Sequence, residues 1–160
     1  MTGVQTCALP ISPEQILLPS SAPVSIYAFG CWARQTIVAL QIVTTLKPTT
    51  TVEFDIAELR TRTAQRPHVL DRALRTYERR PISALRRKAL ARAEQWIVSR
   101  QEQDGSWGGI QPPWVWSIIA LHARGYAIDH PVQQRALAGI ETFTIDDEFG
   151  RRVEIGRAHV

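Results

Sequence analysis

Apolar residues recur at intervals of three and four positions over much of the chain, and this spacing predicts helices with one buried face. The first such run begins at Ile26 and is ended by Pro48, which cannot continue a helix. A second, short run covers residues 68–79. The expected apolar face of the first helix consists of Ile26, Phe29, Gly30, Ala33, Ile37, Leu40 and Val43 or Thr44.

Three further helices follow in the second half of the chain. One is expected from Pro81, which suits the first turn of a helix, to near Gln103. Another starts at the two prolines of residues 112–113 and is stopped by Gly125, and the last covers residues 131–142. In the helix after Pro81, the buried face should contain Ile82, Leu85, Ala89, Ala93, Trp96 and Ile97, with Arg86, Arg87, Glu94 and Arg100 outside.

The segments between these runs predict no further regular structure. Residues 12–23 contain three prolines and should form an extended connector that cannot hold a helix. Residues 49–67 are rich in threonine and read as mostly loop. No run alternates between apolar and polar residues, so no strand is expected. The sequence therefore predicts an all-α fold of paired or toroidal α-hairpins.

Composition limits the classes of function. With 160 residues and 44% hydrophobic content, the chain can form one buried core. Its net charge of +4 comes mostly from arginines that lie beside acidic residues, which is typical of a solvated or anionic-surface-facing helix face. We therefore expect no nucleic-acid partner, and a nucleic-acid binder is kept only as a remote alternative whose affinity would fall steeply with salt.

The cysteines and the apolar runs exclude other classes. Cys7 and Cys31 have no suitably spaced histidine partner, so neither a disulfide framework nor a metal site is expected. The longest apolar run, residues 36–46, is about half of the roughly 20 residues that a membrane-spanning helix needs. The N-terminus has no charged segment followed by a long apolar one, so we predict no signal peptide.

One DNA word can encode both ends of the chain. If residues 5–11 are written CAG ACG TGT GCT CTT CCG ATC, the reverse complement, read one base later, encodes Ile-Gly-Arg-Ala-His-Val, which is residues 155–160. The word resembles a common short-read sequencing adapter. We therefore expect residues 1–11 and 154–160 to be translated adapter on either side of a genuine segment, residues 12–153. Other codons at the two ends of the gene would disprove this.

The connector QEQDGSWGGIQPPW, residues 101–114, is far richer in glycine, proline, glutamine and tryptophan than an ordinary turn between helices. The amide of a glutamine both donates and accepts hydrogen bonds, so Gln101 can tie a helix end to neighbouring backbone while Trp107 packs over it. Gly105 follows an aspartate and supplies a left-handed turn. On these grounds Gln101, Gly105 and Trp107 are interpreted as structural.

Two blocks resemble a known family. The block that leads into the connector and includes its first half, residues 92–107, resembles the QW repeat of the triterpene cyclases, in the version of squalene-hopene cyclases. A second block, YAFGCWARQTIVAL at residues 27–40, resembles the same family at the same relative position. The resemblance covers most of residues 12–153 and is weakest over residues 49–66. It implies an internal fragment with a partial α/α barrel (toroid) of short paired helices. The repeat is carried by Arg92, Ala93, Trp96, Ile97, Gln101, Gly105 and Trp107.

The resemblance also implies site residues. Trp32 is similar to a substrate-lining aromatic, and Phe29 and Ile37 match residues of a channel constriction. Ile110, Gln111 and Pro112 match the segment near the final cation, where a glutamine holds the water that accepts the last proton or adds as hydroxyl. The alternative for Trp32, Phe29 and Ile37 is core packing, and for Gln111 a helix N-terminal cap. Trp114 and Trp116 are expected to be packing residues.

The acid that starts the family's reaction is a DxDD segment, which this chain does not contain. The acidic run at residues 146–148 lacks the pattern and is interpreted as a solvated loop. The expected function is therefore that of a fragment of a squalene-hopene cyclase, an isomerase that cyclises squalene to hopanoids through carbocations, inactive on its own. The alternative is a non-catalytic α/α-toroid that serves as a scaffold or protein-binding segment.

The resemblance implies partners and a location as well. The expected substrate is squalene or a similar linear polyprenyl, and no cofactor is expected. The full-length protein would lie as a peripheral (monotopic) protein on the cytoplasmic membrane of a bacterium, with a homodimer as an open alternative.

Overall fold

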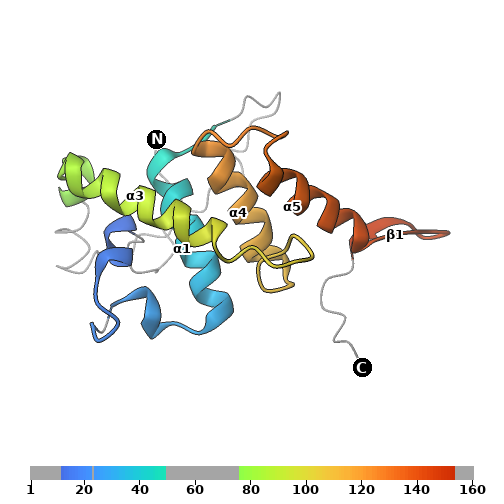
Figure 1. Ribbon diagram of the computed structural model, residues 1–160, viewed down its shortest axis with the longest axis horizontal. Helices are drawn as coiled ribbons and strands as arrows, with labels where there is room; N and C mark the ends of the chain where they lie inside the picture. The colour runs from blue at the N-terminus through green and yellow to red at the C-terminus, as the bar shows by residue number, and fades with distance from the viewer. Residues whose placement is uncertain (1–11, 23, 50–75, 154–160) are drawn as a thin grey trace, which may run out of the picture.

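The computed structural model describes residues 12–22, 24–49 and 76–153 (Figure 1). The predictions for the terminal segments, residues 1–11 and 154–160, lie outside the described residues. So do almost all of the threonine-rich stretch after residue 48 and the start of the helix predicted over residues 68–79. The last four residues of that helix, residues 76–79, are helical.

Four long helices make up about half of the described chain, and short helices add to them, which confirms the all-α prediction. Each of them begins or ends beside a proline or glycine that the sequence marked. The helix before Pro48 ends at Leu46, and its C-cap residue, Lys47, has a left-handed backbone with φ of 49°. Gly125, with φ of 97°, follows the third helix. The four are α1 (Cys31–Leu46), α3 (Ser83–Val98), α4 (Gln111–Ala123) and α5 (Pro131–Thr142).

The N-terminal part differs from the prediction in two places. The connector predicted to hold no helix contains a short 3-10 helix, η1 (Pro13–Leu17), because its proline occupies the first turn, where a missing N–H costs no hydrogen bond. The helix predicted from Ile26 starts as a second 3-10 helix, η2 (Ile26–Ala28), and α1 begins only after Gly30. The chain therefore bends between η2 and α1.

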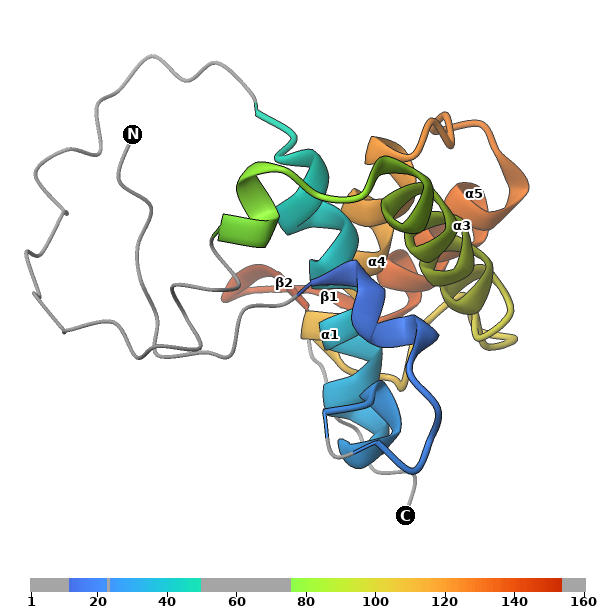
Figure 2. The same cartoon turned by 90° about the vertical axis from the view of Figure 1, so that its left-hand side faces the viewer.

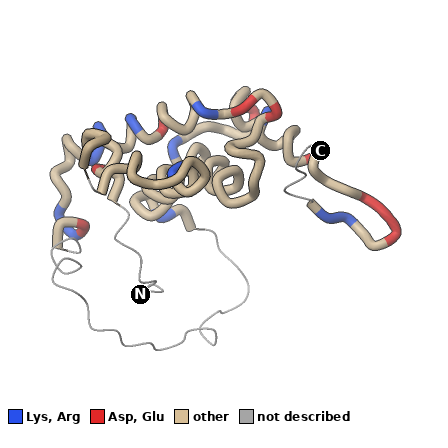
Figure 3. The backbone as a smooth tube through the Cα atoms, turned by 90° about the horizontal axis from the view of Figure 1, so that it is seen from below, with Lys and Arg blue, Asp and Glu red and all other residues tan. Residues whose placement is uncertain are grey.

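A β-hairpin follows α5, and the expectation of no strand is wrong there. β1 (Thr144–Asp147) pairs antiparallel with β2 (Gly150–Val153), and Asp146 lies opposite Arg151. Figure 3 shows acidic residues along one arm of the hairpin and basic residues along the other. Opposite charges across a strand pair are stabilising. The sequence did not reveal the strands because most of their residues are exposed, so no apolar face imposes an alternating pattern.

The helices pack around one core. α1 and α4 lie side by side, α3 crosses them, and α5 lies on the other side of α4 (Figure 1). In the turned view η1 lies beside α1, and it also contacts α3 (Figure 2). The buried apolar residues come from η1, η2, the four long helices and the connector between α3 and α4: Ile16, Ile26, Val38, Ala39, Ile42, Ala89, Leu90, Ala93, Trp96, Ile97, Trp107, Trp114, Ala120, Leu121, Val132 and Ala136.

The buried face of α3 is rotated from the predicted one at its N-terminal end. Ile82 and Leu85 are exposed, whereas Arg86, which was expected outside, is only 8% exposed. Its guanidinium binds Glu14 of η1 at 2.6 Å and Glu78 at 2.9 Å. A charged side chain is buried here because two carboxylates from outside the helix surround it, which no periodicity along α3 can show.

These groups form one cluster. The Tyr77 hydroxyl donates to Glu14 Oε1 at 2.9 Å, and the Ser12 hydroxyl donates to the other oxygen of the same carboxylate. Both nitrogens at the end of the Arg86 guanidinium donate to Glu78, at 2.9 and 3.0 Å. We call Ser12, Glu14, Tyr77, Glu78 and Arg86 the Arg86 cluster. It joins η1 to α3 through charge-assisted hydrogen bonds.

The Arg86 cluster should make stability depend on acid. Burial raises the pKa of Glu14, but hydrogen bonds from Ser12, Arg86 and Tyr77 outweigh this and hold the pKa below its ordinary 4.5. Stabilisation by the ionised carboxylate is therefore present above pH 4.5 and is lost as the pH falls through the lower folded-state pKa. We expect Glu14→Gln to flatten the dependence of the free energy of unfolding on pH in this window, measured by urea unfolding. Glu148→Gln, at an exposed carboxylate, should keep the wild-type dependence.

Candidate functional site

The Gln101 side chain joins three elements of the chain. Its Nε2 donates to the carbonyl of Gly105 at 3.2 Å and to that of Val132, in α5, at 2.8 Å. Its Oε1 accepts two hydrogen bonds from the guanidinium of Arg135, at 2.7 and 3.1 Å. All three contacts start from one amide, so Gln101 holds the connector and the first turns of α5 beside the end of α3.

Trp107 closes the same junction from the other side. The ring is completely buried, and its Nε1 donates to the carbonyl of Ile97 at 2.8 Å. Ile97 lies in the last turn of α3, where backbone carbonyls have no partner within the helix. Trp107 therefore caps α3 while it fills the core beneath the connector.

Gly105 allows the connector to approach α5. Its φ is +85°, and a Cβ built there would lie 2.1 Å from the carbonyl oxygen of Arg135. The turn around it is fixed by Ser106, whose N–H donates to Asp104 Oδ1 at 2.9 Å, and by Glu102, which accepts from the N–H of Gly108 at 3.0 Å. No larger residue fits at position 105 without moving α5 or the turn.

Gly105→Ala should therefore destabilise the chain far more than Gly125→Ala. Both glycines have left-handed backbones, with φ of +85° and +97°, but a Cβ at Gly125 meets nothing within 4 Å. The left-handed backbone alone costs roughly 1–2 kcal/mol for an alanine, and only Gly105→Ala adds the collision with α5. Urea unfolding of both variants measures the difference. Equal losses in the free energy of unfolding would show that the close approach of Gly105 to Arg135 adds nothing to the cost of the substitution.

The predicted wall residues begin at the first turn of α1. Trp32 is 63% exposed, while Phe29, just before the helix, and Ile37 are half-buried. Trp32 and Ile37 are five residues apart, which turns their side chains about 140° from each other around a helix. The indole of Trp32 therefore faces away from the core, and Ile37 lies on a different side of α1.

The second predicted group precedes and opens α4. Ile110 is the N-cap residue and is half-buried, whereas Gln111 and Pro112 are exposed. No side chain makes a capping hydrogen bond at this helix end, so the geometry does not support the capping alternative for Gln111. The segment is anchored by Trp114, whose Nε1 donates to the carbonyl of Ala136 at 3.1 Å.

The structure brings these two groups to the same end of the α1–α4 pair. Gly108, three residues before Gln111, lies against Gln35 of α1: a Cβ on Gly108 would be 2.7 Å from Gln35 Oε1. Gln35 is one turn after Trp32. The beginnings of α1 and α4 thus adjoin, and their exposed side chains there are mainly apolar.

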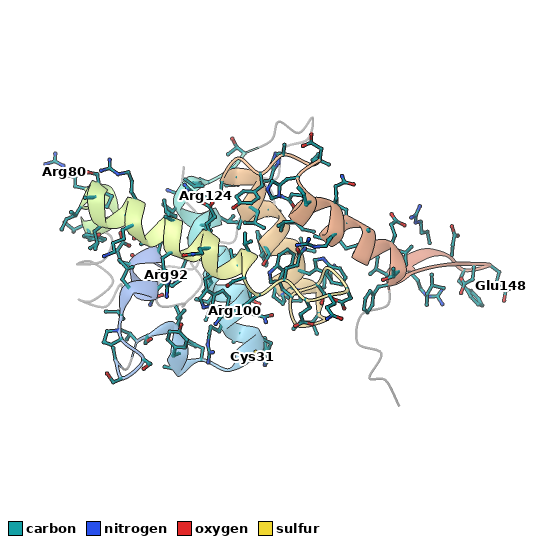
Figure 4. The ribbon with its side chains drawn as sticks, viewed as in Figure 1. Cys31, Arg80, Arg92, Arg100, Arg124 and Glu148 are labelled. Atoms are coloured by element: carbon teal, nitrogen blue, oxygen red, sulfur yellow. The ribbon has the colours of Figure 1, made fainter. Side chains whose placement is uncertain are left out.

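The acidic run of residues 146–148 lies elsewhere. Figure 4 places Glu148 at the hairpin tip, far from Cys31 at the start of α1. Asp146 and Asp147 belong to β1 and not to the predicted loop, but all three residues are exposed, as expected of a solvated segment. Asp147 is paired with Arg152 at 2.6 Å. The hairpin that carries these three carboxylates is therefore not close to the start of α1, where Trp32 lies.

The comparisons with known proteins agree with this architecture. The sequence model for the squalene-hopene cyclase N-terminal domain matches residues 5–149. The chain belongs to the squalene-hopene cyclase family. It is 36% identical to the squalene–hopene cyclase of Alicyclobacillus acidocaldarius over 155 residues, which cover 88% of the chain and 24% of that protein.

Other relatives come from a fungus and a plant. A squalene hopane cyclase of Aspergillus fumigatus is 34% identical, over 92% of the chain and 23% of the fungal protein. Dammaradiene synthase of Dryopteris crassirhizoma is 28% identical, over 85% of the chain and 22% of that protein. The chain therefore spans about a quarter of the length of these relatives, and the resemblance to the triterpene cyclases is confirmed.

In this squalene-hopene cyclase domain, two side chains that sequence reasoning missed position the predicted residues. Arg34 donates to the carbonyls of Ile26 at 3.1 Å and Phe29 at 2.8 Å, and its guanidinium lies 5.0 Å from the centre of the Tyr27 ring. It fixes the bend before Trp32. The other is Gln35, beside Gly108. Both occur in the family-like block at residues 27–40, but their contacts reach back along the chain or across to the connector before α4, so spacing gave no signal.

The described part of this cyclase domain offers no obvious metal site. Among residues 12–22, 24–49 and 76–153, no three histidine, cysteine, aspartate or glutamate side chains gather closely enough to hold an ion. No helix in the same ranges combines the length and apolar character that crossing a bilayer requires.

Proposed function

We propose that the chain is a segment of a longer squalene-hopene-type cyclase, an isomerase that folds squalene and cyclises it through carbocations to hopanoids. The supporting observation is the start of α1, where Gln35 lies against Gly108 of the connector that leads to Gln111 and where the Trp32 indole, one turn earlier, is exposed. Family membership supports the class of reaction, and the two cyclases with squalene in their names support the substrate.

Trp32 has the environment that a cation-stabilising aromatic requires. An aromatic face stabilises a cation only if nothing else covers it. Of the five tryptophans in the chain, Trp96, Trp107 and Trp114 are buried and Trp116 is half-buried, and the Trp96 ring is covered by Arg100 at 3.9 Å. Trp32 alone is largely exposed. We therefore assign Trp32 to the wall that folds the polyprenyl chain. Phe29 and Ile37, which lie half-buried, are assigned to the channel constriction that the family resemblance implies.

Gln111 is assigned the last step. Its exposed amide carries both donors and an acceptor at the start of α4, so it can hold a water molecule against the final cation. Ile110 and Pro112 on either side supply apolar contact with the substrate. Proline has no backbone N–H, so Pro112 and Pro113 leave fewer backbone donors at this helix end to compete with the Gln111 amide for that water.

We propose that the chain alone is inactive, because residues 1–160 contain no DxDD acid to protonate the substrate. In the full-length protein this domain would work without a cofactor at the surface of the bacterial cytoplasmic membrane, as a peripheral (monotopic) protein, with a homodimer as an open alternative. Nucleic acid is not among its proposed partners. Gln101, Gly105 and Trp107 would act as the structural QW motif of the domain.

The deciding experiment is recovery of the contiguous gene. Amplification outward from the codons of residues 27–40 and 101–114 should replace the sequence of residues 1–11 and 154–160 and reveal a DxDD segment downstream. Membranes containing the expressed full-length protein should then convert squalene to cyclic triterpenes, detected by gas chromatography and mass spectrometry. A full-length gene without DxDD, whose product leaves squalene unchanged, would favour the non-catalytic α/α-toroid scaffold.

A further inference from the structure

Gln35 carries a buried polar atom that the rest of the structure leaves without a hydrogen bond. The residue is only 6% exposed, and its Oε1 is fully buried with no hydrogen-bond partner among the described residues. Buried polar atoms in folded proteins are nearly always satisfied, either by protein groups or by ordered water. A water molecule bound to Gln35 Oε1 is the physical way to satisfy this acceptor.

The position of Gln35 gives this water a place near the proposed active site. Gln35 Oε1 lies against Gly108, at the point where a Cβ on the glycine would be 2.7 Å away. The N–H groups of Gly108 and Gly109 are already bound by Glu102 and Ser106, so this part of the connector is held on one side by its own chain. Gln35 is the polar group of α1 that faces it from the other side.

A second buried glutamine on α1 faces a different part of the structure. Gln41 is completely buried, and its Oε1 also lacks a hydrogen-bond partner among the described residues. Its Nε2, however, donates to Gln15 of η1 at 3.1 Å. Gln41 therefore ties α1 to the N-terminal segment, whereas Gln35 faces the connector that leads to Gln111.

We propose that Gln35 is a positioning residue for Gln111. Its Oε1 lies directly against Gly108 and accepts a hydrogen bond from an ordered water, and this contact fixes where Ile110 and Gln111 lie at the start of α4. The proposal rests on the proposed function, because it concerns how that reaction ends.

The end of the reaction depends on where the water at Gln111 lies. The final cation can lose a proton from a neighbouring carbon to water, which gives an alkene and a hydronium ion. Alternatively, the oxygen lone pair of water forms a C–O bond to the cation, and the resulting oxonium ion loses a proton to give an alcohol. A small displacement of Gln111 moves the water relative to these two carbons, so Gln35 should set the ratio of alcohol to alkene.

The test uses the full-length enzyme with squalene as the substrate. Gln35→Met keeps the length of the side chain and removes the amide, and we expect it to change the alcohol-to-alkene ratio by a factor of about three or more. Gln41→Met makes the same change at the matched buried position and should leave the ratio at the wild-type value. Gln35→Asn, which retains an amide, should restore the ratio in part. Thermal melting of each variant reports any loss of folding separately.

The outcomes separate the two proposals. If the wild-type enzyme cyclises squalene but Gln35→Met lowers only the total turnover, as Gln41→Met does, then Gln35 is a structural residue and this inference is overturned. If the wild-type enzyme does not cyclise squalene at all, the proposed function fails first, and the role of Gln35 falls with it. A changed ratio together with wild-type melting supports the positioning role.

Discussion

Trp107→Ala is expected to lower the free energy of unfolding of the chain by about 3–5 kcal/mol, the usual cost of removing a buried aromatic side chain. The substitution has two effects at once. It leaves a cavity under the connector, because the ring is completely buried, and it removes the donor to the carbonyl of Ile97. Urea unfolding followed by far-ultraviolet circular dichroism measures the loss.

Two controls divide this effect into its parts. Trp107→Phe retains most of the apolar volume but not the N–H, so it should cost only about 0.5–1.5 kcal/mol, the usual net contribution of one hydrogen bond, because the carbonyl of Ile97 still accepts from the N–H of Arg100 at 3.0 Å. Trp32→Ala removes the same side chain from a site that is 63% exposed and should change stability by less than about 0.5 kcal/mol. If Trp32→Ala destabilised the chain as much as Trp107→Ala, Trp107 would not be the residue that closes the junction of α3 and α5.

The helix ends and the hairpin show how much of the fold could be predicted from the sequence. The ends of α1 and α4 were predictable because proline and glycine act locally: Pro48 and Gly125 follow these helices by two residues. The 131–142 helix was predicted at its observed bounds for the same reason. The end of α3 was predicted near Gln103 and lies at Val98, where no such residue marks it. The hairpin was not predictable, since its strands bury no face and leave no periodic pattern.

The candidate site was predictable only as far as local motifs reach. The connector suggested that Gln101 and Trp107 tie helices together, but not that the Gln101 amide binds Val132 and Arg135, which lie 31 and 34 residues further along the chain. The role of Gln35 could not be predicted from the sequence, for a related reason. Its importance comes from an unsatisfied atom beside a glycine of another segment, and only the packing of α1 against the connector reveals it.

Arg86 is the clearest case in which tertiary contacts override the helical pattern, and it gives the second large prediction. Arg86→Leu should lower the free energy of unfolding by about 3–5 kcal/mol, the cost of breaking a buried ion pair from one side. The leucine itself suits the interior. The loss arises because Glu14, whose side chain is 15% exposed, keeps its charge but loses the guanidinium that compensates it.

The neighbouring arginine provides the matched control. Arg87 is exposed, so Arg87→Leu should change stability by no more than about 0.5 kcal/mol. Arg86→Leu combined with Glu14→Leu should recover much of the loss, because apolar groups of similar volume can replace a buried ion pair at little cost. The recovery would appear in urea unfolding as a double variant more stable than Arg86→Leu alone. A double variant less stable than Arg86→Leu would mean that Glu14 stabilises the link between η1 and α3 through Tyr77 and Ser12 even without Arg86.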